Sequence, residues 1–210
     1  MQLLYQTHSP YARKVLVMAH ETGLAGLLHV IHQETSPTLR NDLVFAANTL
    51  GKVPVPVPVL MLEGGLTLFD SSVICEFLDG LHEGPLLIPV KGPERWRALR
   101  LHALAQGMID AGIALRWETE RRPAEVRWSP MADGQTEKLI AAYDFAEREA
   151  PTGPLDLGQI ALAAALDWLE FRALPDFRAG RPRLTARFEA FTRRPSMTAT
   201  TYRGQTRDAA

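Results

Sequence analysis

Residues 1–31 read MQLLYQTHSPYARKVLVMAHETGLAGLLHVI and predict a strand, a helix and a second strand. Ser9 is a good N-cap and Pro10 suits the first position of a helix, which Gly23 then ends. Two strands joined by a crossover helix predict a parallel pair in one sheet. The expected elements are a strand at 1–6, a helix at 10–22 and a strand at 27–31.

Farther along, the stretch GKVPVPVPVL at 51–60 carries prolines at three alternate positions. Each proline removes a donor from a sheet ladder, so regular strand is expected only after Pro58. A strand, a turn at Gly64-Gly65 and another strand follow, and Asp70 then opens a helix with one apolar face. The predicted order is β-α-β-α-β-β-α, which is the order of a thioredoxin-like fold.

The composition changes after this α/β part of the chain. Residues 83–93, EGPLLIPVKGP, are rich in Gly and Pro and predict a linker. We therefore expect an α/β N-terminal thioredoxin-like domain at 1–82 and an all-α C-terminal helical domain at 94–210. The helices expected in the second domain are 94–121, 134–149, 157–173 and 184–193.

One of these helices has a distinctive sequence. Residues 156–171, DLGQIALAAALDWLEF, are mostly apolar and predict a central buried helix. Asp156 and Gln159 predict a capping box at its start, in which each side chain bonds the backbone near the other. This feature concerns folding and not catalysis.

Composition excludes several classes of function. A net charge of −1 gives no basic face for nucleic acid and no electrostatic reason to sit on a membrane. The one cysteine, Cys75, cannot form an intrachain disulfide, and its place among apolar residues predicts a buried thiol. No secretory signal or long apolar run is evident, so a cytoplasmic location is expected. No cluster of His, Cys and Asp has metal-ligand spacing, so no metal is expected.

Four motifs follow one another in an order that is typical of a known family. They are SPYARKV at 9–15, NTLGKVPV at 48–55, DSSVICEFLD at 70–79 and RPSMTAT at 194–200. In these motifs the chain resembles the soluble (cytosolic) glutathione S-transferases over nearly its whole length, and most of all the bacterial members with Ser-Pro at the first helix. The resemblance implies glutathione as cosubstrate, a small electrophilic acceptor and a homodimer.

Ser9 is the expected catalytic residue. A helix N-terminus carries partial positive charge, and a hydroxyl there can donate to a thiolate and lower the pKa of the cysteine of glutathione. The alternative is that Ser9 is only an N-cap. Tyr5 and Tyr11 are competing hydroxyls, because some classes of the family use a tyrosine.

Asp70 and Ser71 are expected to bind the γ-glutamyl end of glutathione. Helix N-terminal amides favour a carboxylate, which the N–H and hydroxyl of Ser71 would bind, while Asp70 would pair with the ammonium group. The alternative is that Asp70 caps the helix and Ser71 fills its first turn. Both interpretations can hold at once.

The resemblance also implies a valine before a cis-proline that pairs with the cysteinyl part of glutathione through its backbone. The preceding Gly-Lys favours Val53-Pro54. The spacing favours Val57-Pro58 instead, because this family has the proline about a dozen residues before the acidic residue and Pro58 is 12 before the aspartate at 70. We predict Val57-Pro58. Lys52 is expected to meet the glycine carboxylate of glutathione, with a solvated loop lysine as the alternative.

The function expected is conjugation of glutathione to small electrophiles, a detoxification chemistry, with Ser9 stabilising the thiolate. One alternative is a glutathione-dependent disulfide reductase that uses the thiol of the cofactor. Another is a non-catalytic binding or regulatory protein that keeps the transferase fold. The unusual run of three Val-Pro steps beside the expected site favours the last alternative.

Overall fold

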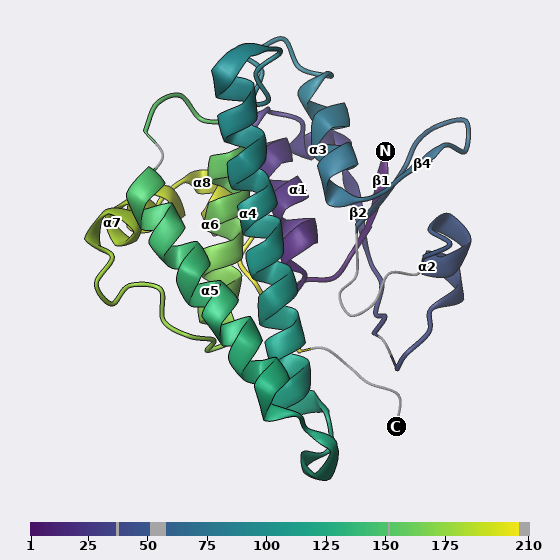
Figure 1. Cartoon of the computed structure of the whole chain (residues 1–210). Helices are drawn as coiled ribbons and strands as arrows, with labels where there is room; N and C mark the ends of the chain where they lie inside the picture. The colour runs from purple at the N-terminus through teal and green to yellow at the C-terminus, as the bar shows by residue number, and fades with distance from the viewer. Residues whose placement is uncertain (37, 51–57, 151, 206–210) are drawn as a thin grey trace. The chain divides into compact units, whose positions relative to one another are not determined.

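The computed structural model describes residues 1–36, 38–50, 58–150 and 152–205 (Figure 1). The chain forms two compact units, one from Met1–Val90 together with the chain from Pro195 onward, and one from Lys91–Arg194. The break near residue 90 falls inside the predicted linker. The grouping of 195–205 with the first unit differs from the sequence expectation, which assigned these residues to the helical domain. The predicted boundaries of the folding domains stay a prediction.

The first unit contains a mixed four-stranded sheet in the order β2-β1-β3-β4. β1 is parallel to β2 and antiparallel to β3, and β3 is antiparallel to β4. Because β3 runs opposite to both β1 and β4, β4 runs in the same direction as β1. The C-terminal ends of β1 and β4 therefore lie at the same edge of the sheet. The predicted mixed sheet is confirmed. The strands are β1 Gln2–Tyr5, β2 His29–His32, β3 Val59–Met61 and β4 Thr67–Leu68.

Helices cover this sheet. α1 packs against α3 and against the short α8, and Figure 1 shows α2 across the strands from α1 and α3. The core between α1, α3 and the sheet holds fully buried apolar side chains such as Val15, Leu60 and Ile74. The helices of this unit are α1 Pro10–Glu21, α2 Asp42–Ala47, α3 Ser71–Asp79 and α8 Pro195–Ala199, with a 3₁₀ turn η1 at Ala25–Leu27.

The C-terminal segment is tied to α1 and to the loop before it. Arg13, only 4% exposed, donates from Nη2 to the carbonyl of Met197 (3.0 Å) and stacks on the ring of Tyr202 (4.2 Å to the centroid). The N–H of Arg203 donates to the carbonyl of Thr7 (3.1 Å), and the hydroxyl of Thr7 donates to the carbonyl of Arg203 (2.8 Å). Residues 197–203 therefore complete the first unit.

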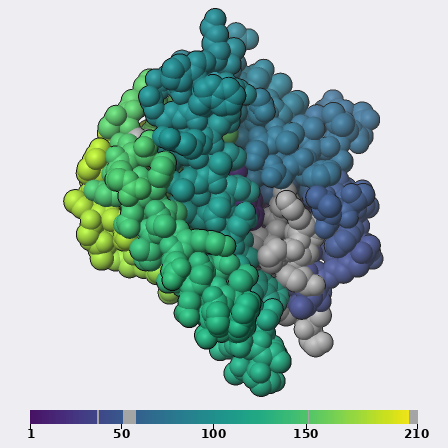
Figure 2. Space-filling model, in the orientation of Figure 1, coloured from purple at the N-terminus to yellow at the C-terminus, as the bar shows by residue number. Residues whose placement is uncertain are grey.

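The second unit is helical, as predicted. α6 is its central buried helix, and its interior side chains are almost all apolar. α5 begins at Ser129, earlier than the predicted residue 134, because Pro130 suits a first helical turn. Most of α5 lies at the surface (Figure 2). The elements are α4 Gly92–Arg116, a π turn η2 Trp117–Arg121, a 3₁₀ turn η3 Ala124–Val126, α5 Ser129–Glu149, α6 Leu157–Phe171 and α7 Pro182–Thr192.

The predicted capping box at the start of α6 forms only in part. The carboxylate of Asp156 accepts a hydrogen bond from the backbone N–H of Gln159 (2.9 Å). The side chain of Gln159 donates to the carbonyl of Pro154 (2.6 Å) instead of bonding the backbone N–H of Asp156. The side-chain amide of glutamine can donate a hydrogen bond to a carbonyl, whereas the carboxylate of a glutamate can only accept one. Gln159 can therefore bond the carbonyl of Pro154.

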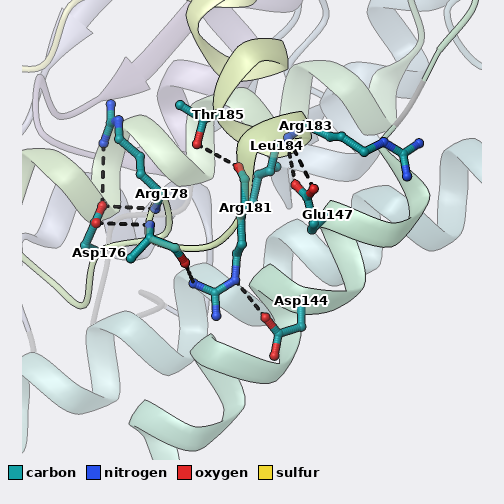
Figure 3. A network of polar contacts seen from close by, with 9 residues as sticks. Asp144, Glu147, Asp176, Arg178, Arg181, Arg183, Leu184 and Thr185 are labelled. Atoms are coloured by element: carbon teal, nitrogen blue, oxygen red, sulfur yellow. Dashed lines mark hydrogen bonds and ion pairs between the residues drawn. The ribbon is translucent and has the colours of Figure 1, made fainter.

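The start of α7 is capped by a side chain from another helix. Glu147 on α5 accepts hydrogen bonds from the backbone N–H groups of Arg183 (3.2 Å) and Leu184 (2.7 Å) (Figure 3). Nearby, Arg181 donates to Asp144 (2.7 Å), also on α5. The two bonds to Glu147 satisfy N-terminal amides of α7 that no side chain of α7 itself caps. Every helix within the described ranges is too short or too polar to span a bilayer.

α4 and α6 approach each other closely at a glycine. A Cβ built on Gly158 of α6 would lie 2.6 Å from the carbonyl oxygen of Ala98 and 2.8 Å from the Cβ of Leu101, both on α4. The absence of a side chain at Gly158 therefore sets the separation of these two helices.

We predict that Gly158→Ala lowers the free energy of unfolding by about 2 kcal/mol, because α4 must move to admit the methyl group. Gly107→Ala on α4 is the matched control, since a Cβ there meets nothing within 4 Å. It should raise the free energy of unfolding by about 0.5–1 kcal/mol through helix propensity. Urea unfolding measures both, and equal effects of the two substitutions would contradict the close packing at Gly158.

Candidate functional site

One edge of the sheet gathers several of the residues predicted to bind or act. Because β4 is parallel to β1, α1 and α3 both begin at this edge. Leu4 pairs with Val59 in the antiparallel register, so Pro58 stands at the same edge, just before β3. Ser9, Pro58 and the start of α3 therefore share one end of the first unit. Lys52, Val57 and the step Val53-Pro54 lie outside the described residues. The choice between the two Val-Pro steps therefore stays a prediction.

Ser9 occupies the N-cap position of α1. Its backbone is extended (φ −83°, ψ 120°), and its hydroxyl accepts a hydrogen bond from the backbone N–H of Ala12 (3.2 Å). The side chain is 1% exposed. The capping interpretation is therefore confirmed, while a role toward a thiolate stays a prediction. Of the competing hydroxyls, Tyr11 is buried in α1, and Tyr5 is half-buried and packs edge-on against His32 (5.9 Å between centroids).

Asp70 is the N-cap of α3, and its carboxylate accepts a hydrogen bond from the backbone N–H of Ser72 (2.8 Å). Burial on its own would raise the pKa of this carboxyl group. Hydrogen bonds from Ser72 and the charge of Lys14 outweigh burial, and the pKa of Asp70 is lowered. Asp70 therefore carries its negative charge throughout the neutral range.

Ser71 is the first residue of α3 and is fully buried. Among the described residues, no group makes a hydrogen bond with its hydroxyl oxygen. A buried hydroxyl without a partner costs free energy, and native structures contain few of them. The start of α3 thus has a charged carboxylate beside an unsatisfied hydroxyl.

Lys14 was not anticipated from the sequence as part of this site. It lies on α1, is 1% exposed, and acts electrostatically on Asp70 of the neighbouring helix. Its position offered a signal, because it precedes Met18 by one helical turn and so falls on the buried face of α1. A lysine on the apolar face of a helix needs an anionic partner or ligand.

Cys75 is fully buried in α3, as predicted. Burial raises the pKa of its thiol to about 12, although Lys14 opposes the shift. The thiol is therefore protonated and unreactive at neutral pH.

A cavity of about 220 Å³ opens beside Ser9 on the side of α1 that faces the C-terminal segment. Its walls come from the end of β1 and the loop that follows, from α1 at Arg13, and from residues 199–203. All of these residues belong to the first unit. In the described part of the chain, no group of three or more His, Cys, Asp or Glu side chains is placed to hold a metal ion.

Comparison with known proteins relates both units to one family. Residues 8–81 match the family model "Glutathione S-transferase, N-terminal domain". The uncharacterized GST-like protein YibF of Escherichia coli (strain K12) is 31% identical over 206 residues, which cover 95% of this chain and 98% of that protein.

Solved structures resemble the chain over nearly its whole length. A glutathione transferase family member from Pseudomonas fluorescens Pf-5 with bound glutathione is 37% identical, with a TM-score of 0.90 over 97% of this chain and 99% of that one. A structure of a Pf-5 family member with bound S-(propanoic acid)-glutathione is also 37% identical, with a TM-score of 0.85 over 97% and 100%. A glutathione S-transferase from Methylobacillus flagellatus KT with glutathione bound is 30% identical, with a TM-score of 0.82 over 96% and 99%. The predicted thioredoxin-like domain followed by a helical domain is confirmed.

We predict that the charge of Asp70 stabilises the fold in a pH-dependent way. Its pKa is lowered on folding, so its stabilisation is present above the ordinary value of 3.8 and is lost as the pH falls through the folded value. Asp70→Asn keeps a capping oxygen and removes the charge. The loss of stability in this variant, measured by urea unfolding, should be equal at pH 7 and pH 5 and smaller at pH 3.

A Lys14→Met background provides the control for this experiment. If Lys14 contributes to the shift, Asp70→Asn should cost less stability at pH 7 in that background than in the original chain. A cost that stays the same at pH 3 would contradict the assignment of the effect to the charge of Asp70.

Proposed function

We propose, since this chain belongs to the glutathione S-transferase family, that it binds glutathione at the sheet edge where α1 and α3 begin and conjugates it to small electrophiles. The relatives from Pseudomonas fluorescens and Methylobacillus flagellatus with glutathione bound support this assignment of the cosubstrate. The relative with bound S-(propanoic acid)-glutathione supports a site that also accommodates an S-substituted glutathione.

The observation that carries the proposal is the unsatisfied hydroxyl of Ser71. A carboxylate at the N-terminus of α3 would accept a hydrogen bond from this hydroxyl and further bonds from backbone N–H groups of the first turn. The α-carboxylate of the γ-glutamyl residue of glutathione is such a group. Its ammonium neighbour would pair with Asp70, whose lowered pKa keeps the carboxylate charged.

Ser9 would then act on the thiol of glutathione. The hydroxyl lies at the positive end of α1, where it would donate a hydrogen bond to the sulfur and favour the thiolate. Bonding the thiolate requires the hydroxyl proton to point away from α1, which agrees with Ser9 accepting from the N–H of Ala12. The thiolate attacks an electrophilic carbon, a sulfur–carbon bond forms, and the leaving group departs with its electron pair. The thiol proton passes to solvent.

Other parts of the proposal stay predictions. We keep Val57-Pro58 as the step that pairs with the cysteinyl backbone, and Lys52 as the partner of the glycine carboxylate. The homodimer and the cytoplasmic location also stay predictions. Pro58 directly precedes β3 and lies at the sheet edge where α1 and α3 begin. This position supports the choice of Val57-Pro58.

We predict that Ser71→Ala separates binding from stability. The variant should unfold within about 0.5 kcal/mol of the original, because the hydroxyl has no partner among the described residues. Its Kd for glutathione should rise about tenfold or more, since a hydrogen bond to a charged group is lost. Calorimetry and urea unfolding measure the two quantities. Ser129→Ala, at the exposed first residue of α5, is the matched control and should change neither.

We also predict that Ser9→Gly raises the pKa of the thiol of bound glutathione. The ultraviolet absorbance of the thiolate as a function of pH measures this pKa. Turnover of 1-chloro-2,4-dinitrobenzene should fall about 100-fold, the usual cost of losing one donor to a reacting anion. Glycine is chosen because it costs an N-cap only a few tenths of a kcal/mol, so the fold is kept. If the thiol pKa and the turnover are unchanged, Ser9 is only a cap.

A further inference from the structure

A second cavity, in the helical unit, is separate from the residues proposed to bind glutathione. It has a volume of about 220 Å³ and is enclosed by α6, α7 and the loop before α6. All of its described lining belongs to Lys91–Arg194, whereas Ser9, Asp70 and Ser71 belong to the other unit. The proposed function therefore leaves this cavity without a role.

The floor of this cavity is apolar and buried. Leu162 and Leu166 come from α6, Leu184 and Phe188 come from α7, and each of the four is at most 4% exposed. Ala163 of α6 also lines the floor, and its small side chain leaves room between the two helices. Water in such a space contacts apolar walls, so an apolar group that displaces the water gains free energy.

The mouth of the cavity is cationic. Its described lining holds Arg187 and Arg194 and contains no Asp or Glu. Arg194 lies over the ring of Phe191 (5.5 Å to the centroid), whereas Arg187 is exposed and makes no hydrogen bond or ion pair with any described residue. The segment 181–194 has five arginines and one acidic residue, so the surrounding potential is positive. A carboxylate at the mouth would therefore give Arg187 a charged partner.

The size of the cavity limits the length of an apolar chain inside it. Sites for drug-sized molecules measure about 300–1,000 Å³, so a space of about 220 Å³ suits a smaller compound. A methylene group is about as large as a water molecule, whose share of liquid volume is about 30 Å³. The space therefore accommodates about seven carbons, and a carboxylate attached to them would lie at the mouth.

We propose that this cavity binds medium-chain carboxylic acids, with the alkyl chain against the apolar floor and the carboxylate on Arg187. The inference goes beyond the proposed function and does not depend on it, because no residue of the described lining is proposed to bind glutathione. Binding is reversible, and no covalent bond forms or breaks.

Calorimetric titration of the full chain with free acids tests the proposal. Octanoate should bind at one site per chain and about tenfold or more tightly than hexanoate, because each buried methylene contributes about fourfold in affinity. Decanoate should gain no more than about twofold over octanoate, since its additional carbons stay in water. Octanoate should bind about threefold or more tightly than octanamide, which is nearly isosteric but uncharged.

Two pairs of variants at exposed positions locate the site. Arg187→Gln should remove most of the preference for octanoate over octanamide, whereas Arg193→Gln, outside the lining, should keep it. Ala190→Leu narrows the mouth and should weaken octanoate binding about tenfold or more, because the chain is excluded from the floor. Ala186→Leu, also exposed on α7 but outside the lining, is its control and should have no effect. Substitutions at exposed positions keep the fold, which urea unfolding checks.

Each outcome supports or overturns the proposal. No binding of octanoate, or equal affinity for octanoate and octanamide, overturns recognition of a carboxylic acid. A preference that survives in Arg187→Gln, or binding that survives in Ala190→Leu, overturns the placement of the acid in this cavity. Tighter binding of N-acetylleucine than of octanoate would assign the cavity to a polypeptide C-terminus and overturn the choice of a free acid. Glutathione affinity should stay the same in every variant, and failure of glutathione to bind the original chain concerns only the proposed function.

Discussion

The direction of the strands is the constraint on which the candidate site depends. β4 returns parallel to β1 after two reversals, so the helices that follow these strands both point their positive N-terminal ends toward one edge of the sheet. Antiparallel pairing of β3 brings Pro58 to that edge as well. Under the proposed function, an anionic tripeptide would meet two helix N-termini and the start of β3 at this edge.

α1 separates two buried cations that serve different neighbours. Lys14 acts on Asp70 at the start of α3, whereas Arg13 bonds the C-terminal segment. Burial of a cation is costly unless an opposing charge or good hydrogen bonds compensate for it. The two residues are adjacent in the sequence, yet one acts on the start of α3 and the other holds the C-terminal segment.

Features governed by near neighbours were predictable from the sequence. The caps at Ser9 and Asp70 were predicted because a capping oxygen meets an N–H only two or three residues later. The buried state of Cys75 followed from helical spacing. Arg13 was missed because its partner Met197 lies 184 positions away, and no local pattern specifies such a contact. The carbonyl chosen by the side chain of Gln159 depended on loop geometry that spacing does not fix.

The use of residues 197–203 to complete the first unit has a consequence for synthesis of the protein. A ribosome makes the sheet and α1 first, but the hydrogen-bond partners of Arg13 and Thr7 emerge only after residues 91–194, which form the second unit. At ordinary elongation rates of about 5–20 residues per second, synthesis of the 184 positions that separate Arg13 from Met197 takes on the order of 10–40 seconds. During that interval the guanidinium of Arg13 would lack its bond to Met197, and the helical unit, whose residues are contiguous, would have its full sequence before the first unit does.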